Sequence, residues 1–351
     1  MRHHSRRKCQ YHARPADFVT LRSGIDDRQA RTMMDRLHVR AVVGLAGAAA
    51  VSVAARRVRA LSSSGALAAT AVGATVVVGR GIRGGGMLLA FFCSSTLLGR
   101  LPASVHLEQR RGRERDAVQV MANGGVAAAL ALASSLPREP TRSLLIAGFG
   151  GAVATATADT WATEIGSRSR TQPRSILTLR PTARGASGSV TMAGLTASAV
   201  AATLIAWIAS VPFTTTARHP SPRAFAIAGG GFTGALVDSV LGATVQEVRF
   251  CDSCFVETEE RLHHCGAQTQ VIRGAEWCGN DTVNAIATAA GATTAILAQL
   301  PSFIRGQWAR RAPVPARQGD VRVEYVGRAT NWPGTNRAAL DVRLGTRLSA
   351  L

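Results

Sequence analysis

Residues 143–166 read SLLIAGFGGAVATATADTWATEIG, an apolar run that ends in two acids. The run itself, residues 143–158, consists mostly of small and aliphatic side chains, which let transmembrane helices approach one another closely. It leads directly into Asp159 and Glu164. An ionised carboxylate in or near hydrocarbon is costly unless it has a partner or a function. The stretch therefore predicts a membrane-embedded helix whose polar end carries chemistry.

Further apolar runs of similar composition lie on either side of this one. They cover residues 41–55, 65–79, 85–99, 117–136, 188–213, 224–246 and 283–300. A helix needs about 20 apolar residues to cross the hydrocarbon, so 41–55 and 65–79 are the doubtful spans. Buried helices of a water-soluble protein are the alternative, but 46% hydrophobic and only 5% aromatic residues fit a membrane bundle better. We predict an all-α, polytopic transmembrane bundle of six to eight helices.

The formal net charge is +20, and nearly all the positive charge comes from arginine, because Lys8 is the only lysine. The arginines are dispersed between the apolar runs and in the tails, which argues against a nucleic-acid partner. Between the runs they concentrate in the loops 100–116, 159–187 and 247–282. The positive-inside rule predicts that these three loops share the cytoplasmic face.

The chain divides into a membrane domain and two tails. Residues 41–300 hold all the apolar runs, and residues 1–40 form a basic N-terminal tail without an apolar stretch of their own. Residues 301–351 combine prolines with scattered arginines and show no sustained period, which predicts a basic flexible tail.

Two more acids occur in apolar surroundings. Asp238 lies within GGGFTGALVDSVLGATVQ, and Asp281 lies in GNDTVNAIA at the start of the last run, beside Asn280 and Asn284. Carboxylate and amide oxygens suit magnesium, which keeps several waters and bridges to phosphate. The predicted magnesium ligands and catalytic residues are Asp159, Glu164, Asp238 and Asp281, with Asn280 and Asn284 as substrate-binding residues.

Simpler explanations of these acids and amides stay open. A loop arginine such as Arg168 would stabilise an acid by pairing with it, without any chemistry. The glycines around Asp238 suit tight helix packing. Asn280 or Asp281 would also serve as the N-cap of the last helix.

Candidate phosphate ligands occur in two other segments. In RGRERDAVQVMANGG, Arg115 and Asp116 precede an apolar run in which Gln119 and Asn123 are four residues apart on one helical face. Arginines at a membrane boundary usually anchor lipid headgroups, but beside carboxylates they also bind phosphate. The glycines of PTARGASGSV can expose backbone N–H groups to an anion. The predicted phosphate-binding residues are Arg115, Asp116, Asn123, Arg184, Gly185 and Gly188.

A separate cluster of thiols and imidazoles occurs in FCDSCFVETEERLHHCG. Its first two cysteines have the two-residue spacing of a metal knuckle, and its third follows two histidines. A stable disulfide is not expected if the loop is cytoplasmic. We predict a structural zinc site formed by Cys251, Cys254, His263 and Cys265, with His264 and Cys278 as competing candidates for the fourth ligand.

The sequence contains no P-loop, no GxGxxG before a helix, no GxSxG and no HExxH. Five ordered motifs instead resemble the integral membrane family called domain of unknown function 92, or transmembrane protein 19. They are RERDAVQVMANGG, ADTWATEIG, PRSILTLRPTARGASGSVTMAG, GALVDSVLGATVQ and GAEWCGNDTVN, and they span roughly residues 60–300. The CDSC and HHC insertion looks like the variant of prokaryotic members, so we expect a multi-pass protein of a prokaryotic plasma membrane.

The family includes the plastid phytyl-phosphate kinase. The resemblance therefore implies a membrane phosphotransferase that moves a phosphoryl group from a nucleoside triphosphate to an isoprenoid monophosphate, in contact with membrane lipid. Such a transfer depends on positioning, cations and positive charge more than on covalent catalysis. Two other classes stay open: a cation-coupled carrier that uses the same intramembrane acids, and a non-catalytic scaffold organised by zinc.

Overall fold

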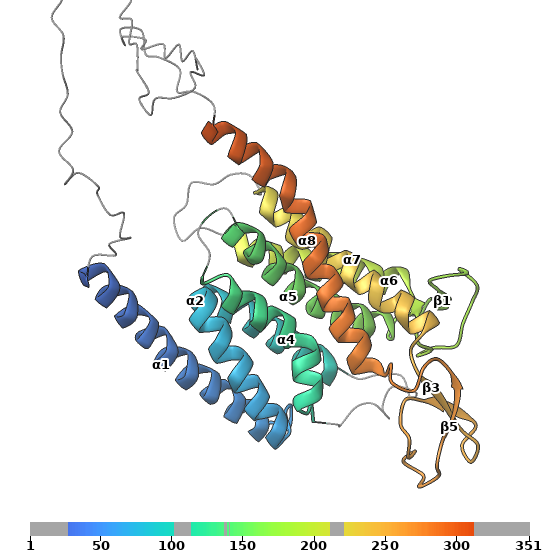
Figure 1. The fold of residues 1–351 in the computed structure, drawn as a ribbon. Helices are drawn as coiled ribbons and strands as arrows, with labels where there is room; N and C mark the ends of the chain where they lie inside the picture. The colour runs from blue at the N-terminus through green and yellow to red at the C-terminus, as the bar shows by residue number, and fades with distance from the viewer. Residues whose placement is uncertain (1–26, 102–113, 137–138, 140, 211–220, 312–351) are drawn as a thin grey trace, which may run out of the picture. The chain divides into compact units, whose positions relative to one another are not determined.

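The computed structural model describes residues 27–101, 114–136, 139, 141–210 and 221–311. Most of these residues are helical (Figure 1). The helices are α1 (Asp27–Arg57), α2 (Ser63–Arg100), α4 (Ala117–Ala133), α5 (Thr141–Gly166), α6 (Met192–Ser210), α7 (Pro222–Thr244) and α8 (Asn280–Arg311). The chain divides into two units, residues 1–300 and 301–351, and the described part of the second is the end of α8.

The helices of the described residues confirm a membrane bundle. Five segments are long and apolar enough to cross a bilayer, and α4 is a shorter apolar helix. The five are Leu37–Arg57, Ser63–Arg100, Met192–Ser210, Pro222–Thr244 and Asn280–Ser302. The doubtful run 41–55 is therefore part of a longer helix, because α1 extends it on the N-terminal side.

Parts of both predicted tails are helical. Helix α1 begins at Asp27, within the predicted N-terminal tail, and α8 continues through Pro301 to Arg311. The other residues of the two tails, 1–26 and 312–351, lie outside the described part of the chain.

Helix α2 is a hairpin of two helical segments. A straight helix of 38 residues would be about 57 Å long. The C-terminal end of α2 nevertheless lies beside the segment that joins α1 to α2, because Arg100 donates to the carbonyl of Val58 at 2.9 Å. The chain reverses at Gly81, whose φ of 66° and ψ of −165° are accessible to glycine and strained for other residues. The expected separate runs 65–79 and 85–99 are the two arms of this hairpin.

Helix α5 is the centre of the bundle. Its residues 147–158 are all buried, and it packs against α2, α4, α6 and α7. Small residues also bring α7 and α8 together: a Cβ added to Gly230 of α7 would lie 2.5 Å from the carbonyl oxygen of Gly291 in α8. The composition that predicted a membrane helix thus serves close backbone packing.

The predicted motif loops return to one end of the bundle, here called the loop end. Arg168, just after α5, donates to the carbonyls of Leu98 and Leu101 at the end of α2. In the next part of the same loop, Gly188 packs against Ala243 at the end of α7. Loop 247–282 begins there, because α7 ends at Thr244. Which membrane face this end occupies stays a prediction.

Positive charge also gathers at the opposite end of the bundle. The turn of the α2 hairpin carries Arg80, whose charge is repelled by nearby arginines from α1, α2, α5 and α7. These far-end arginines are Arg40, Arg80, Arg83, Arg142 and Arg223. These arginines are dispersed in the sequence. Counting the arginines of each loop therefore could not predict that they lie together at one end of the folded bundle.

Because the loops lie at one end of the bundle, lysines placed in them should all be either labelled or protected when an impermeant amine reagent is added to cells. Because Lys8 is the only lysine, a Lys8→Arg background permits single Arg→Lys substitutions that keep the charge. Lysines placed at the exposed positions Arg57, Arg180 and Arg261 should respond alike to an impermeant amine reagent in intact cells, and a lysine at exposed Arg142 should respond oppositely. Peptide mass spectrometry reads each site. Different responses among the first three would contradict the arrangement.

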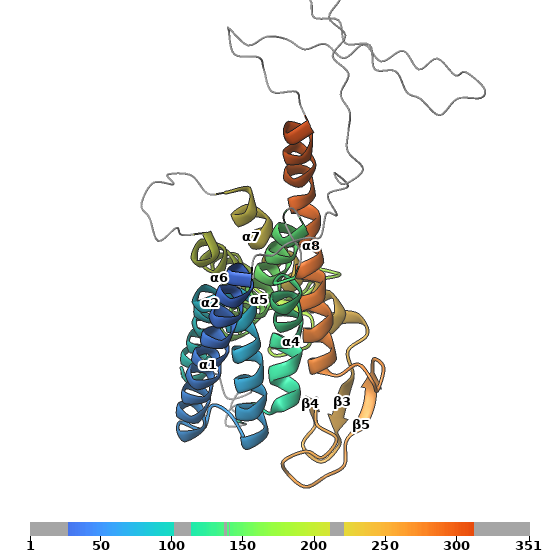
Figure 2. The same cartoon turned by 60° about the vertical axis from the view of Figure 1, so that its left-hand side comes forward.

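Two small sheets complete the loop end. Strands β1 (Arg174–Ser175) and β2 (Ser189–Val190) pair within the loop between α5 and α6. Strands β3 (Val248–Cys251), β4 (Val256–Thr258) and β5 (Gln270–Arg273) form an antiparallel sheet in the order β4-β3-β5 between α7 and α8 (Figure 2). This second sheet holds the Cys/His cluster.

Candidate functional site

A polar cavity of about 200 Å³ lies at the loop end, between α4, α5 and α8. Every side chain that lines it is an acid, an amide, a hydroxyl or an arginine. The lining residues are Arg115, Gln119, Asn123, Asp159, Thr160, Thr163, Glu164, Asn280, Asp281 and Asn284. Three sequence motifs that are far apart along the chain therefore contribute to one site.

The backbone around Arg115 is fixed by the segment between α1 and α2. Arg115 N donates to the carbonyl of Ala60 at 3.2 Å, and Arg115 O accepts from Ser62 N. Its guanidinium donates to Ser95 Oγ at 3.2 Å. Burial lowers the pKa of Arg115 from its ordinary value, and the nearby Glu164 carboxylate opposes this shift. An arginine remains protonated in proteins, so the cavity carries a fixed positive charge.

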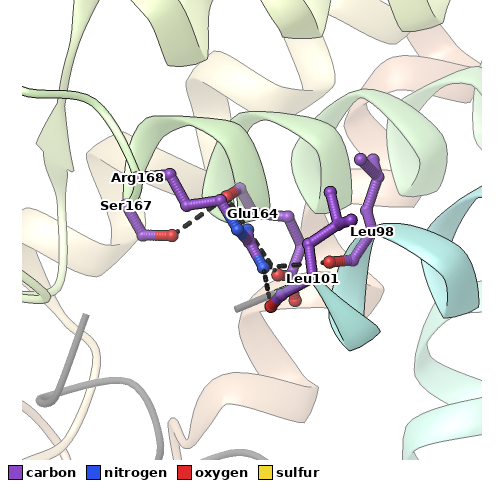
Figure 3. Close-up of polar contacts among 5 residues, drawn as sticks. All are labelled: Leu98, Leu101, Glu164, Ser167 and Arg168. Atoms are coloured by element: carbon purple, nitrogen blue, oxygen red, sulfur yellow. Dashed lines mark hydrogen bonds and ion pairs between the residues drawn. The ribbon is translucent and has the colours of Figure 1, made fainter. Parts of the chain in front are cut away.

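Glu164 is paired with Arg168 on the last turn of α5 (Figure 3). Arg168 Nη1 lies 2.9 Å from Glu164 Oε2 and also donates to the Glu164 carbonyl, while Nη2 donates to Leu98 O and Leu101 O at 2.9 and 3.0 Å. Arg168 therefore joins the end of α5 to the end of α2. The pairing explanation that the sequence left open applies to Glu164, which also lines the cavity.

Asp159 and Asp238 approach each other from α5 and α7. Their carboxyl groups are within hydrogen-bonding reach, and Asp238 Oδ2 is buried with no hydrogen-bond partner. Two carboxylates this close repel each other unless a proton or a cation lies between them. The pair, with its unsatisfied oxygen, suits a hard divalent cation.

One acid beside this pair was not predicted. Glu259, in the loop that follows β4, lies close enough to Asp238 for the two charges to repel. It also accepts a hydrogen bond from Gln246 Nε2 at 2.9 Å. Acids are common in polar loops, so nothing in the sequence distinguished Glu259 from its neighbours Glu257 and Glu260.

Several predicted phosphate ligands lie outside the cavity lining. Asp116 is the N-cap of α4, and its carboxylate accepts from Gln119 N at 3.0 Å. Arg184 donates to the carbonyls of Ser169 and Arg170 within its own loop. Gly185 and Gly188 both have positive φ in that loop, and Gly188 is packed against α7. The cavity therefore contains Arg115 and Asn123 from the predicted phosphate-binding set.

The four predicted zinc ligands lie together in a second cluster. Cys251, Cys254, His263 and Cys265 each present a ligand atom within 4.8 Å of the others. Among the described residues, no other group of three or more His, Cys, Asp or Glu side chains converges so closely. The cavity acids do not form such a group of three or more within the described residues.

The Cys/His group also has a distinct electrostatic character. A hydrogen bond with His263 lowers the pKa of Cys265 to about 6. Burial raises the pKa of Cys278, which is not part of the group.

The fold and the cavity define a multi-pass membrane protein with a polar site at one end of a helix bundle. The chain belongs to the family described as integral membrane protein DUF92, whose model matches residues 46–292. This confirms the family that the five motifs indicated.

Similar proteins occur in a plant and an archaeon. The chain is 35% identical over 193 residues to Protein PGR of Arabidopsis thaliana, covering 49% of this chain and 67% of that protein. It is 27% identical over 195 residues to an uncharacterized membrane protein of Methanocaldococcus jannaschii, covering 54% of this chain and 76% of that protein. No solved structure matches. Because the relatives include a plant protein, the prokaryotic plasma membrane stays a prediction.

Proposed function

We propose that the cavity is the site of a phosphotransferase that moves a phosphoryl group from a nucleoside triphosphate to a membrane-bound isoprenoid monophosphate. One observation carries the proposal: an arginine, acids and amides from α4, α5 and α8 converge on a single polar cavity at the end of a membrane bundle. Phosphoryl transfer needs this combination of positive charge and cation ligands.

The size of the cavity indicates which parts of the substrates it holds. Pockets for whole small molecules usually measure about 300–1,000 Å³. About 200 Å³ is smaller and suits the reacting phosphates with their cations. The nucleoside and the prenyl chain would extend beyond it, the latter along the exposed apolar surface of α4 or α8, the two cavity helices with exposed apolar side chains. Such a division places the reacting phosphate groups at the membrane boundary.

In this proposal a terminal oxygen of the isoprenoid monophosphate attacks the γ-phosphorus of the nucleoside triphosphate. The bond from that phosphorus to the β-γ bridging oxygen breaks, giving an isoprenoid diphosphate and a nucleoside diphosphate. Arg115 contacts the phosphates, and Asn123, Asn280 and Asn284 orient them by hydrogen bonds. Asp159 and Asp238, together with Asp281, would hold magnesium, which neutralises phosphate charge when bound. Glu164 keeps Arg168 and the end of α5 in place.

The direct test is an assay of purified protein in lipid nanodiscs. We expect the γ-phosphate of a labelled nucleoside triphosphate to appear in a lipid diphosphate when a matching prenyl monophosphate is supplied with magnesium. A panel of chain lengths and nucleotides identifies the substrates. Absence of transfer across the panel, combined with ion-driven uptake into proteoliposomes that needs no nucleotide, would replace the kinase proposal with the carrier class.

A further inference from the structure

We propose that Cys251, Cys254, His263 and Cys265 bind one zinc ion that holds the sheet between α7 and α8 beside the acid pair. Zinc–sulfur bonds of about 2.3 Å in a tetrahedron place sulfur atoms about 3.8 Å apart. The Sγ atoms of Cys251 and Cys265 are 3.6 Å apart, and His263 Nδ1 lies 3.1 Å from Cys265 Sγ. The side chains are thus close to the geometry that the ion requires.

Two backbone turns present the ligands in pairs. In the first, Phe255 N donates to Cys251 O at 2.8 Å, which folds the chain between β3 and β4 and brings Cys254 back toward Cys251. In the second, Gly266 N donates to His263 O at 2.8 Å and carries Cys265. Cys251 and His263 are buried, whereas Cys254 and Cys265 are exposed, so each turn contributes one buried and one exposed ligand.

The structure also selects the fourth ligand. His263, not His264, contacts a thiol of the group, and His264 is exposed. Cys278 is buried near the start of α8 and lies outside the group. The set is therefore three thiols and one imidazole, which zinc prefers and magnesium or calcium does not. Four protein ligands fill a tetrahedron and leave no position for substrate, so the ion is structural.

The sheet that would hold the zinc is joined to the ends of both flanking helices. Arg273 donates to the carbonyls of Ala243 and Gly242 at 2.6 and 3.1 Å, at the end of α7. On the other side, Glu247 N donates to the carbonyl of Cys278 at 2.8 Å, just before α8. The metal thereby stabilises the connection between the helix that carries Asp238 and the helix that carries Asp281.

Glu259 links the zinc sheet to the acid pair. It follows β4, between the two pairs of ligands, and its carboxylate accepts from Gln246 while lying near Asp238. Without the ion, the segment from Cys254 to His263 would lose the cross-link between its two ends, and the pairing of β4 with β3 would have to position Glu259 without it. This positioning role rests on the proposed function, whereas zinc binding itself does not.

Metal analysis of the purified full chain tests the site without any substrate. We expect about one zinc per chain by the four-ligand count, and Co²⁺ exchanged into the site should give the thiolate charge-transfer and d–d absorption of a tetrahedral centre. The Cys251→Ser/Cys254→Ser variant should lose the zinc. The matched controls Cys93→Ser, which removes an exposed thiol elsewhere, and His264→Asn should retain it.

A conservative variant covers the case in which ligand loss prevents folding. His263→Cys keeps four ligands, so it should retain zinc and shift the Co²⁺ spectrum toward that of a four-thiolate site, whereas His263→Ala should reduce zinc content severalfold. Equal zinc in wild type and the double serine variant, or a Cys251–Cys265 disulfide in the protein as isolated, would overturn the proposal. Either result would overturn the zinc site alone, because the phosphotransferase assay tests the proposed function separately.

Discussion

Replacing Asp159 with Asn is expected to lower the rate of phosphoryl transfer by a factor of about a hundred or more. The change removes one negative charge from the cavity and keeps the shape of the side chain. Asp159 lies on the last turns of the buried helix α5 and meets the carboxyl group of Asp238, so it is central to any cation site there. The measurement is the initial rate of labelled diphosphate formation at saturating substrates and magnesium.

The control for this variant is the same substitution at an exposed position. Asp35→Asn on α1 should leave the rate within a factor of two, because Asp35 is exposed and lies outside the cavity. Asp238→Asn should resemble Asp159→Asn, and the double variant should be little worse than either single one, since residues that act as a unit are not additive. Full activity in Asp159→Asn, with unchanged magnesium dependence, would remove the cation role from the pair.

Gly230→Val is expected to prevent stable folding of the bundle, whereas Gly229→Ala should be tolerated. A Cβ at Gly230 would lie 2.5 Å from Gly291 O and 2.9 Å from the Cβ of Ala295, so α7 and α8 would have to separate. Overpacking of a well-packed interior typically costs about 1–3 kcal/mol, and here backbone atoms block relaxation. At Gly229 nothing lies within 4 Å of an added Cβ.

The adjacent positions make a matched pair in one helix. Alanine favours helix over glycine by about 1 kcal/mol, so Gly229→Ala should keep or slightly raise the melting temperature in detergent. Gly230→Val should appear as aggregate or as a large loss of monodisperse protein in size-exclusion chromatography. Equal yields and melting temperatures for the two variants would show that α7 and α8 do not approach as closely as described.

The polar residues that line the cavity could be recognised in the sequence because they occur where apolar residues are expected. Asp159, Asp281 and Asn123 are polar side chains inside or beside apolar runs, and such placement is costly without a purpose. Their gathering follows from loops that return to one end of the bundle. The same reasoning could not identify Glu259, because a carboxylate in a hydrated loop has no energetic cost that would mark it as functional.

The sequence does not separate the structural contacts that residues of one motif make. Asp116 and Arg184 belong to the same motifs as the cavity residues, yet one caps a helix and the other hydrogen-bonds to loop carbonyls. Composition cannot separate these roles, because capping, loop bonding and phosphate binding use the same donors and acceptors. The choice of His263 over His264 likewise depended on how a turn orients two neighbouring side chains.

The far-end arginines have a consequence for how the protein enters its membrane. Arg80 lies at the turn of the α2 hairpin, and the other four lie near it, on the side opposite the motif loops. If the loops remain in the cytosol, as predicted, biogenesis must carry these arginines across the bilayer. Moving one elementary charge through a membrane voltage of 100 mV involves about 2.3 kcal/mol. The electrical gradient of the host membrane would then oppose translocation of the hairpin, so insertion of this protein would depend on the energy state of the cell.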